Sequence, residues 1–87
     1  MILIKNKREK FARNCGIVLE VIKGEKLCDV ANRLNLDSRR IGQIICHTAR
    51  ELMPGEDRLN YLTAKQIAQE YSARLEQLAL REMQGGG

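Results

Sequence analysis

The chain has 87 residues, of which 44% are hydrophobic and 30% are charged, and its formal net charge is +4. A chain of this length forms one small domain with a modest core, which leaves little room for an enclosed catalytic cavity and disfavours most enzymes. One Phe, two Tyr and no Trp are too few for a base-stacking surface that binds single strands or RNA, while the positive charge favours a polyanionic partner.

Other classes of protein are disfavoured by the order of the residues. The longest apolar run, 17–22, contains Glu20 and is far shorter than the roughly 18 residues that cross a bilayer. The N-terminus is apolar and then basic, the reverse of a secretory signal, so we expect a cytoplasmic protein with no membrane partner. Three widely spaced cysteines predict reduced thiols and no metal site, and no residue pattern indicates a catalytic site or a cofactor.

The positive charge is concentrated in the first part of the chain. Residues 1–53 carry eleven Lys and Arg against six Asp and Glu, whereas residues 54–87 carry four against five. The boundary is Pro54-Gly55, a strong turn signal. We therefore predict a basic arm with a helical unit over 1–53, a linker over 54–62 and a C-terminal helix over 63–84.

Apolar residues recur with the period of a helix, which predicts an all-α fold. The first helix is expected from about Lys7 to Lys23 and is ended by Gly24. The basic residues around the start of this helix form either a solvated helix face or an arm that follows DNA phosphates or the minor groove. These arm residues are Lys5, Lys7, Arg8 and Lys10.

A second, short helix is predicted over 26–34, and a third over 38–52 with Asp37 or Ser38 as its cap. Between them, Asn35 tolerates the left-handed backbone conformation of a tight turn. The inward stripe of the third helix consists of Ile41, Ile44, Ile45, Thr48, Ala49 and Leu52.

The fourth predicted helix begins with the capping box formed by Thr63 and Gln66. Its apolar residues step by 4, 3, 4 and 3, as in the seam of a short coiled coil. The seam consists of Ala64, Ala68, Tyr71, Leu75 and Leu78. It either folds back on the other helices or joins two copies of the chain. We favour a homodimer, because one DNA-binding unit of this size makes few phosphate contacts.

The second and third helices together meet the requirements of a helix-turn-helix, in which the second helix of the motif lies in the DNA major groove. Ala31 is the small residue at the crossing, Asn35 makes the turn and Leu36 fills the space beneath it. The base-contact candidates are Ser38, Arg39 and Gln43, since Arg bonds guanine and Gln bonds adenine. The candidates for contacts to the DNA backbone are Lys26, Arg33, Arg40, His47 and Arg50.

Residues 26–44 read KLCDVANRLNLDSRRIGQI and resemble the fourth conserved region of bacterial sigma-70-type factors. The likeness lies in the Leu-x-x-Val-Ala of the first helix, the turn and the Arg-Ile-x-Gln-Ile run, and it extends to Leu52. It implies promoter binding and docking on RNA polymerase. It places Ser38, Arg39 and Gln43 at base-contact positions and Arg40 at a supporting one. Gly42 departs from the basic or polar residue that is usual in the family.

We therefore predict a sequence-specific binder of double-stranded DNA at the nucleoid, a small transcriptional regulator of bacterial or phage type. One alternative is a protein-interaction module, or sigma-like mimic, that binds RNA polymerase without reading DNA. Another is a small oligomeric adaptor that handles DNA. Selectivity for DNA sequence separates the first class from the second, and ring-like oligomers would indicate the third.

Overall fold

The computed structural model describes the backbone of residues 2–85 and the side chains of residues 10–84. Within this range the chain is all-α, as predicted, and contains no strand. The elements are α1 (Ile2–Ile22), α2 (Leu27–Leu34), α3 (Ser38–Leu52), the 3₁₀ helix η1 (Asp57–Tyr61), α4 (Ala64–Glu70) and α5 (Ser72–Gly85). None of the described helices is both long enough and apolar enough to cross a membrane.

The first three helices end close to their predicted limits because local signals determine those ends. Gly24 has a φ of 113°, and its N–H donates to the carbonyl of Val21 where α1 ends. Asn35 has φ 61° and ψ 42°, the left-handed conformation expected at the end of α2. The start of α1 differs, since the helix begins at Ile2 rather than near Lys7.

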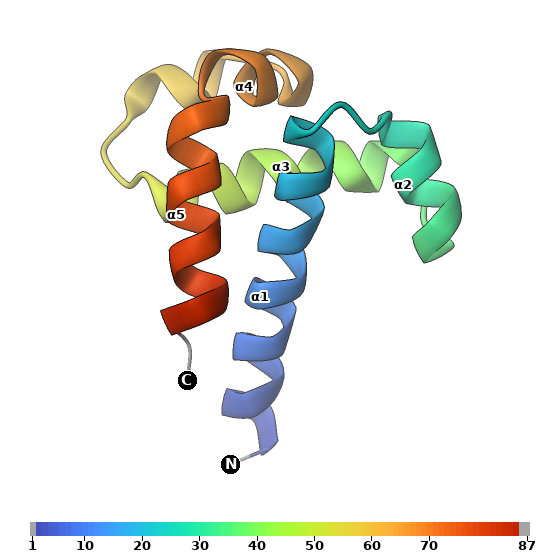
Figure 1. Ribbon diagram of the computed structural model, residues 1–87, viewed down its shortest axis with the longest axis vertical. Helices are drawn as coiled ribbons and strands as arrows, with labels where there is room; N and C mark the ends of the chain where they lie inside the picture. Colours follow the sequence, from blue (N-terminus) through green and yellow to red (C-terminus); the bar gives the residue numbers. More distant parts are fainter. Residues whose placement is uncertain (1, 86–87) are drawn as a thin grey trace.

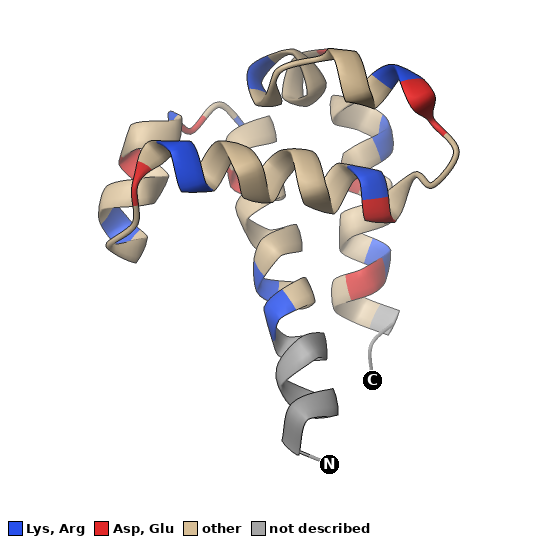
Figure 2. Cartoon of the chain, turned by 180° about the vertical axis from the view of Figure 1, so that it is seen from behind, with Lys and Arg blue, Asp and Glu red and all other residues tan. Residues whose placement is uncertain are grey.

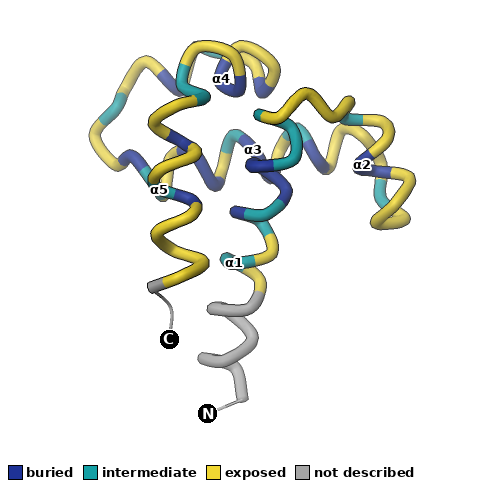
Figure 3. The backbone as a smooth tube through the Cα atoms, viewed as in Figure 1, coloured by how far each residue is buried: buried dark blue, intermediate teal, exposed yellow. Residues whose placement is uncertain are grey.

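The helices form two layers around one main core. Figure 1 shows α1 and α5 side by side and antiparallel, α3 crossing both, α2 at one end of α3 and α4 across the top. The buried positions lie on the inner sides of the helices in Figure 3. Residues that precede Pro54 in the sequence and residues that follow it belong to the same main core. This core includes Ile41 and Ile45 of α3 together with Ile67 of α4 and Leu75 of α5. A smaller cluster of Cys15, Leu19 and Ala79 lies between α1 and α5.

Residues 54–62, predicted as a linker, contribute to this core. Leu59 in η1 is 1% exposed and belongs to the main cluster. Arg58, also in η1, forms a 3.0 Å ion pair with Glu70 at the end of α4. The segment therefore folds against the helices that it connects.

The prediction of one C-terminal helix over 63–84 is wrong, because the chain forms two helices there. Tyr71 leaves the helical conformation, with φ −112° and ψ 19°, and separates α4 from α5. Thr63 and Gln66 make the predicted capping box at the start of α4. In Figure 1, α4 lies across α3 while α5 turns down beside α1. A straight helix could not follow both directions, so the break lets one segment cover two surfaces.

The predicted dimer seam is also corrected, because its residues pack inside their own chain. Ala64, Ala68 and Leu75 are buried, and Tyr71 and Leu78 are half-buried against the main core. The break at Tyr71 removes the continuous helix that a coiled coil needs. This stripe therefore folds back on the other helices of its own chain, which was the first of the two expected arrangements.

Candidate functional site

The most distinctive surface is the side of α3 that faces away from the core. We call it the outer face of α3 and define it by Arg39, Gln43, Cys46, His47 and Arg50. All of these are exposed except Cys46, which is half-buried. Figure 2 shows α3 crossing in front of α1 and α5 with no other helix over it and with basic segments toward both ends. The structure therefore brings several predicted site residues onto one accessible face.

The spacing of these residues follows from helix geometry. Arg39 and Gln43 are four residues apart, which places them on one side of α3 at about 6 Å along its axis. Arg50 lies on the same side, about 16 Å from Arg39 along the axis. Ser38 and Arg40, both exposed, complete the first turn of the helix.

The turn before α3 holds this first turn in place. The Asp37 side chain caps the helix, for its Oδ1 accepts a hydrogen bond of 3.2 Å from the N–H of Arg39. The N–H of Leu36 donates to the carbonyl of Ala31 at 2.8 Å, and Leu36 packs against the core. Ala31 is buried, as the sequence predicts for the crossing of the two helices. Backbone, cap and core thus fix the direction in which Ser38 and Arg39 leave the protein.

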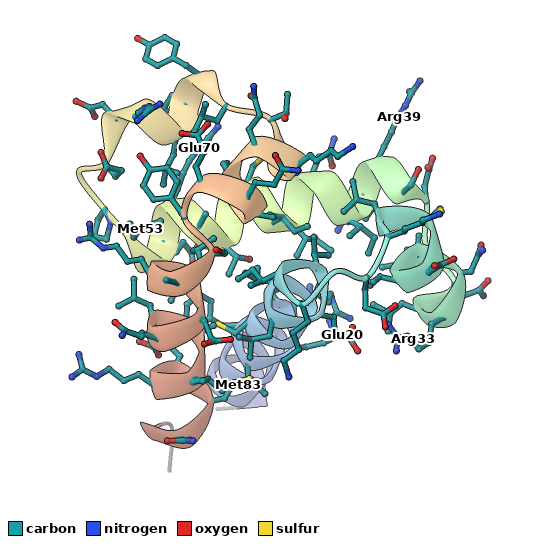
Figure 4. The ribbon with its side chains drawn as sticks, turned by 45° about the horizontal axis from the view of Figure 1, so that its top comes forward. Glu20, Arg33, Arg39, Met53, Glu70 and Met83 are labelled. Carbon is teal, nitrogen blue, oxygen red and sulfur yellow. The ribbon has the colours of Figure 1, made fainter. Side chains whose placement is uncertain are left out.

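Two of the predicted backbone-contact residues already contact a carboxylate. Arg33 on α2 lies 3.2 Å from the carboxylate of Glu20 on α1, and Figure 4 shows the two side chains near each other. His47 Nε2 lies 3.0 Å from the carboxylate of Glu51 one turn along α3. These pairs are exposed and therefore weak, but an anion would have to compete with an internal carboxylate at each.

Among the described residues, the other predicted cations are not engaged by a carboxylate. Lys26, Arg39, Arg40 and Arg50 form no ion pair with any described residue. In Figure 4, Arg39 extends away from the body of the protein into solvent. An unpaired guanidinium on a capped helix offers several N–H donors in a fixed fork, which suits phosphate oxygens and base edges alike.

The basic arm lies mostly outside the described side chains. Lys10 is exposed on α1. The backbone of Lys5, Lys7 and Arg8 belongs to α1, but their side chains lie outside the described set. The predicted role of these residues stays a prediction.

Gly42 lies beside the start of α4, but the structure does not require a glycine there. A Cβ atom at this position would lie 3.8 Å from the Cβ of Ala64 at the start of α4. An alanine would make an ordinary contact there, whereas a long basic side chain would have to run along α4. Gly42 is thus a point at which α4 packs beside α3.

Lys65 is a cation that the sequence did not single out. It is exposed on α4 and lines a groove that also includes Lys26 and Arg39. We call this the α3–α4 groove; its volume is 880 Å³, and residues from the C-terminal end of α1, from α2, α3 and α4, and Ser72 of α5 line it. No local pattern could have identified Lys65, because its position depends on where α4 packs.

The cysteines are all free thiols. Burial raises the pKa of Cys46, and nearby Arg50 only partly opposes that shift, so the reactive thiolate is disfavoured on the outer face. Among the described residues, no group of three or more His, Cys, Asp or Glu side chains could hold a metal ion.

No family model, curated protein or solved structure matches this chain.

Proposed function

We propose that this protein binds double-stranded DNA in a sequence-specific manner and places the outer face of α3 in the major groove. One observation carries the proposal: Arg39 and Gln43 lie one turn apart on an uncovered helix face, and Arg39 has no ion-pair partner among the described residues. The major groove of B-DNA is wide enough to admit an α-helix. A small regulator acting at the nucleoid would use such a surface.

The side chains match the chemistry of base edges. Arg39 would donate two hydrogen bonds to the O6 and N7 of guanine, and Gln43 would pair with the N6 and N7 of adenine. Ser38, at the start of the helix, has a hydroxyl that both donates and accepts. These contacts would determine which sequence is bound.

The remaining cations suit the phosphates on either side. Arg40 and Arg50 lie on α3 and Lys26 directly precedes α2, and all three are exposed. Phosphate contacts would position the protein on the duplex without reading its sequence. Arg33 and His47 would contribute less than these three, because each already pairs with a carboxylate.

A single domain of this size would hold DNA weakly at physiological salt, so we expect two copies on a palindromic site. Because the stripe of α4 and α5 packs inside its own chain, we expect the two copies to meet through another surface. The mass of the complex would give the number of copies directly.

The proposal is tested by selecting bound sequences from a random duplex library and then measuring affinity by gel shift. Arg39→Ala and Gln43→Ala should each lose about 5- to 150-fold in preference for the selected site over a site changed at one base pair, which corresponds to about 1–3 kcal/mol. Arg81→Ala, an exposed arginine on α5, is the matched control and should keep that preference.

Salt dependence separates binding to phosphate from base reading. The logarithm of affinity should fall linearly with the logarithm of salt concentration, and Arg50→Ala should reduce that slope by about 1. Full sequence selectivity in both Arg39→Ala and Gln43→Ala, or the absence of any shifted duplex at low salt, would overturn the proposal.

A further inference from the structure

The α3–α4 groove, on the same side of the molecule as the start of α3, has the composition of a site for a small molecule. Its volume of 880 Å³ falls within the range of about 300–1,000 Å³ that is usual for ligand pockets. Four helices supply most of its walls, so packing rather than a single loop determines its shape.

The floor of the groove is apolar. Val21 and Ile22 from the end of α1 and Leu27 from the start of α2 line it, and each is half-buried against the main core. These aliphatic side chains leave part of their surface in water. A ligand with an apolar body would remove that surface from water, which favours the complex.

The charged residues of the groove are mainly basic. Lys26, Arg39 and Lys65 come from three different parts of the chain, and Glu25 is the single acidic residue in the lining. None of the three cations is ion-paired to a described residue. This excess of unpaired positive charge beside an apolar floor is complementary to an anion that carries a hydrophobic tail or ring.

We propose that the groove binds a small amphipathic carboxylate, an aliphatic or aromatic acid whose apolar body covers Val21, Ile22 and Leu27. Its carboxylate would accept hydrogen bonds from Arg39, whose exposed side chain (Figure 4) would turn over the groove and bind both oxygens with its planar fork, and Lys26 and Lys65 would add positive charge. A DNA phosphate satisfies the cations equally well but has no apolar body to cover the floor. The floor therefore favours the acid over a nucleic-acid backbone.

The groove shares Arg39 with the outer face of α3, and Ser38 at the start of the same helix also lines it. A carboxylate bound there would occupy Arg39 and offset the charge of Lys26. The acid would then weaken DNA binding, a consequence that rests on the proposed function, whereas binding of the acid itself does not.

The binding test uses the full chain labelled with ¹⁵N and octanoate as the probe. Saturable shifts are expected in the backbone amides of Leu27, Arg39 and Lys65. Acetate, which lacks the apolar body, and octylammonium, which carries the opposite charge, should each bind at least about tenfold more weakly. Lys65→Gln should weaken octanoate about threefold to tenfold, while Arg81→Gln, on α5 and outside the groove, should leave it unchanged.

The exposed thiol of Cys28 provides a second measurement, since it lines the groove whereas Cys15 is buried and Cys46 is half-buried. Octanoate should slow the labelling of Cys28 by a maleimide. If octanoate produces no saturable shift, or binds no better than acetate, the site is wrong. If octanoate saturates the groove but changes DNA affinity by less than about fivefold, the site stands and its link to the proposed function is overturned.

Discussion

The helix pairs α2–α3 and α4–α5 pack against the same core, but they differ in the charge on their outer surfaces. On α3, the exposed charged residues are three arginines and one glutamate, and that glutamate pairs with His47. On α4 and α5, the number of Lys and Arg residues, three, equals the number of Glu residues, so the net charge is zero. Burial of aliphatic side chains explains why both pairs fold. It does not explain the net charge of +2 on α3, so the surface of α3 is the better candidate for function and α4–α5 the better candidate for a brace that stabilises the fold.

The two pairs also differ in how their helices are joined. A left-handed Asn35 and the two residues after it separate α2 from α3, whereas Tyr71 alone separates α4 from α5 in a conformation open to any L-residue. The first junction therefore depends on the type of residue, and the second depends on the surfaces that its two helices cover.

The largest expected effect tests whether α5 is a brace. Leu75 is 0% exposed, and Leu75→Ala should lower the free energy of unfolding by about 2–5 kcal/mol, measured by urea denaturation. Leu80→Ala is the matched control on the same helix. Its side chain is 41% exposed, so its loss should be under about 1 kcal/mol.

Two outcomes would contradict the brace. Equal losses from the two leucine substitutions would mean that α5 does not pack through Leu75. If Leu75→Ala instead left the stability of the chain unchanged and caused a dimer to dissociate, the stripe would be an interface between two copies.

A smaller effect concerns the contact of α1 with α5. Burial, together with the nearby Glu82 and Glu51, raises the pKa of Cys15 from 9.0 to about 11. The unfolded chain thus loses this proton at a lower pH than the folded protein does. The stabilisation is complete below pH 9 and is lost as pH rises from 9 toward 11, by no more than about 3 kcal/mol.

This dependence is measured as the difference between variants, because lysines and tyrosines titrate in the same range. Cys15→Ala should remove the additional fall in stability above pH 9, and Cys28→Ser, at an exposed thiol, should retain it. If Cys15→Ala and the unaltered chain lost stability in parallel, the Cys15 thiol would not be protonated preferentially by the fold.

The same contrast separates what could be predicted from the sequence from what could not. The limits of α2 and α3, the turn at Asn35 and the inward side of α3 follow from local signals and helical period, and the structure confirms them. The face that carries Arg39 and Gln43 follows from the same period.

The remaining features depend on contacts between distant segments. The apolar steps of 63–84 fit one continuous helix, and only the positions of α1 and α3 require the break at Tyr71. Leu59 could not be identified as a core residue from the periodicity of apolar residues, because η1 is too short to show one. It is nevertheless buried. Lys65 joins the groove only because α4 packs beside Gly42.

The smallest expected effect tests the junction between α2 and α3. Asn35→Ala places a Cβ-bearing residue that lacks the local hydrogen bonding of Asn at φ 61°, which should cost about 1–2 kcal/mol of stability. Asn35→Gly relieves that strain but adds freedom to the unfolded chain, so it should stay within about 0.5 kcal/mol of the unaltered protein. Because the turn also orients the capped start of α3, Asn35→Ala should weaken binding to the selected DNA site more than Asn35→Gly does. If the alanine and glycine variants had equal stability and equal affinity for DNA, the left-handed turn would contribute to neither. The junction at Asn35 would then depend on residue type no more than the junction at Tyr71 does.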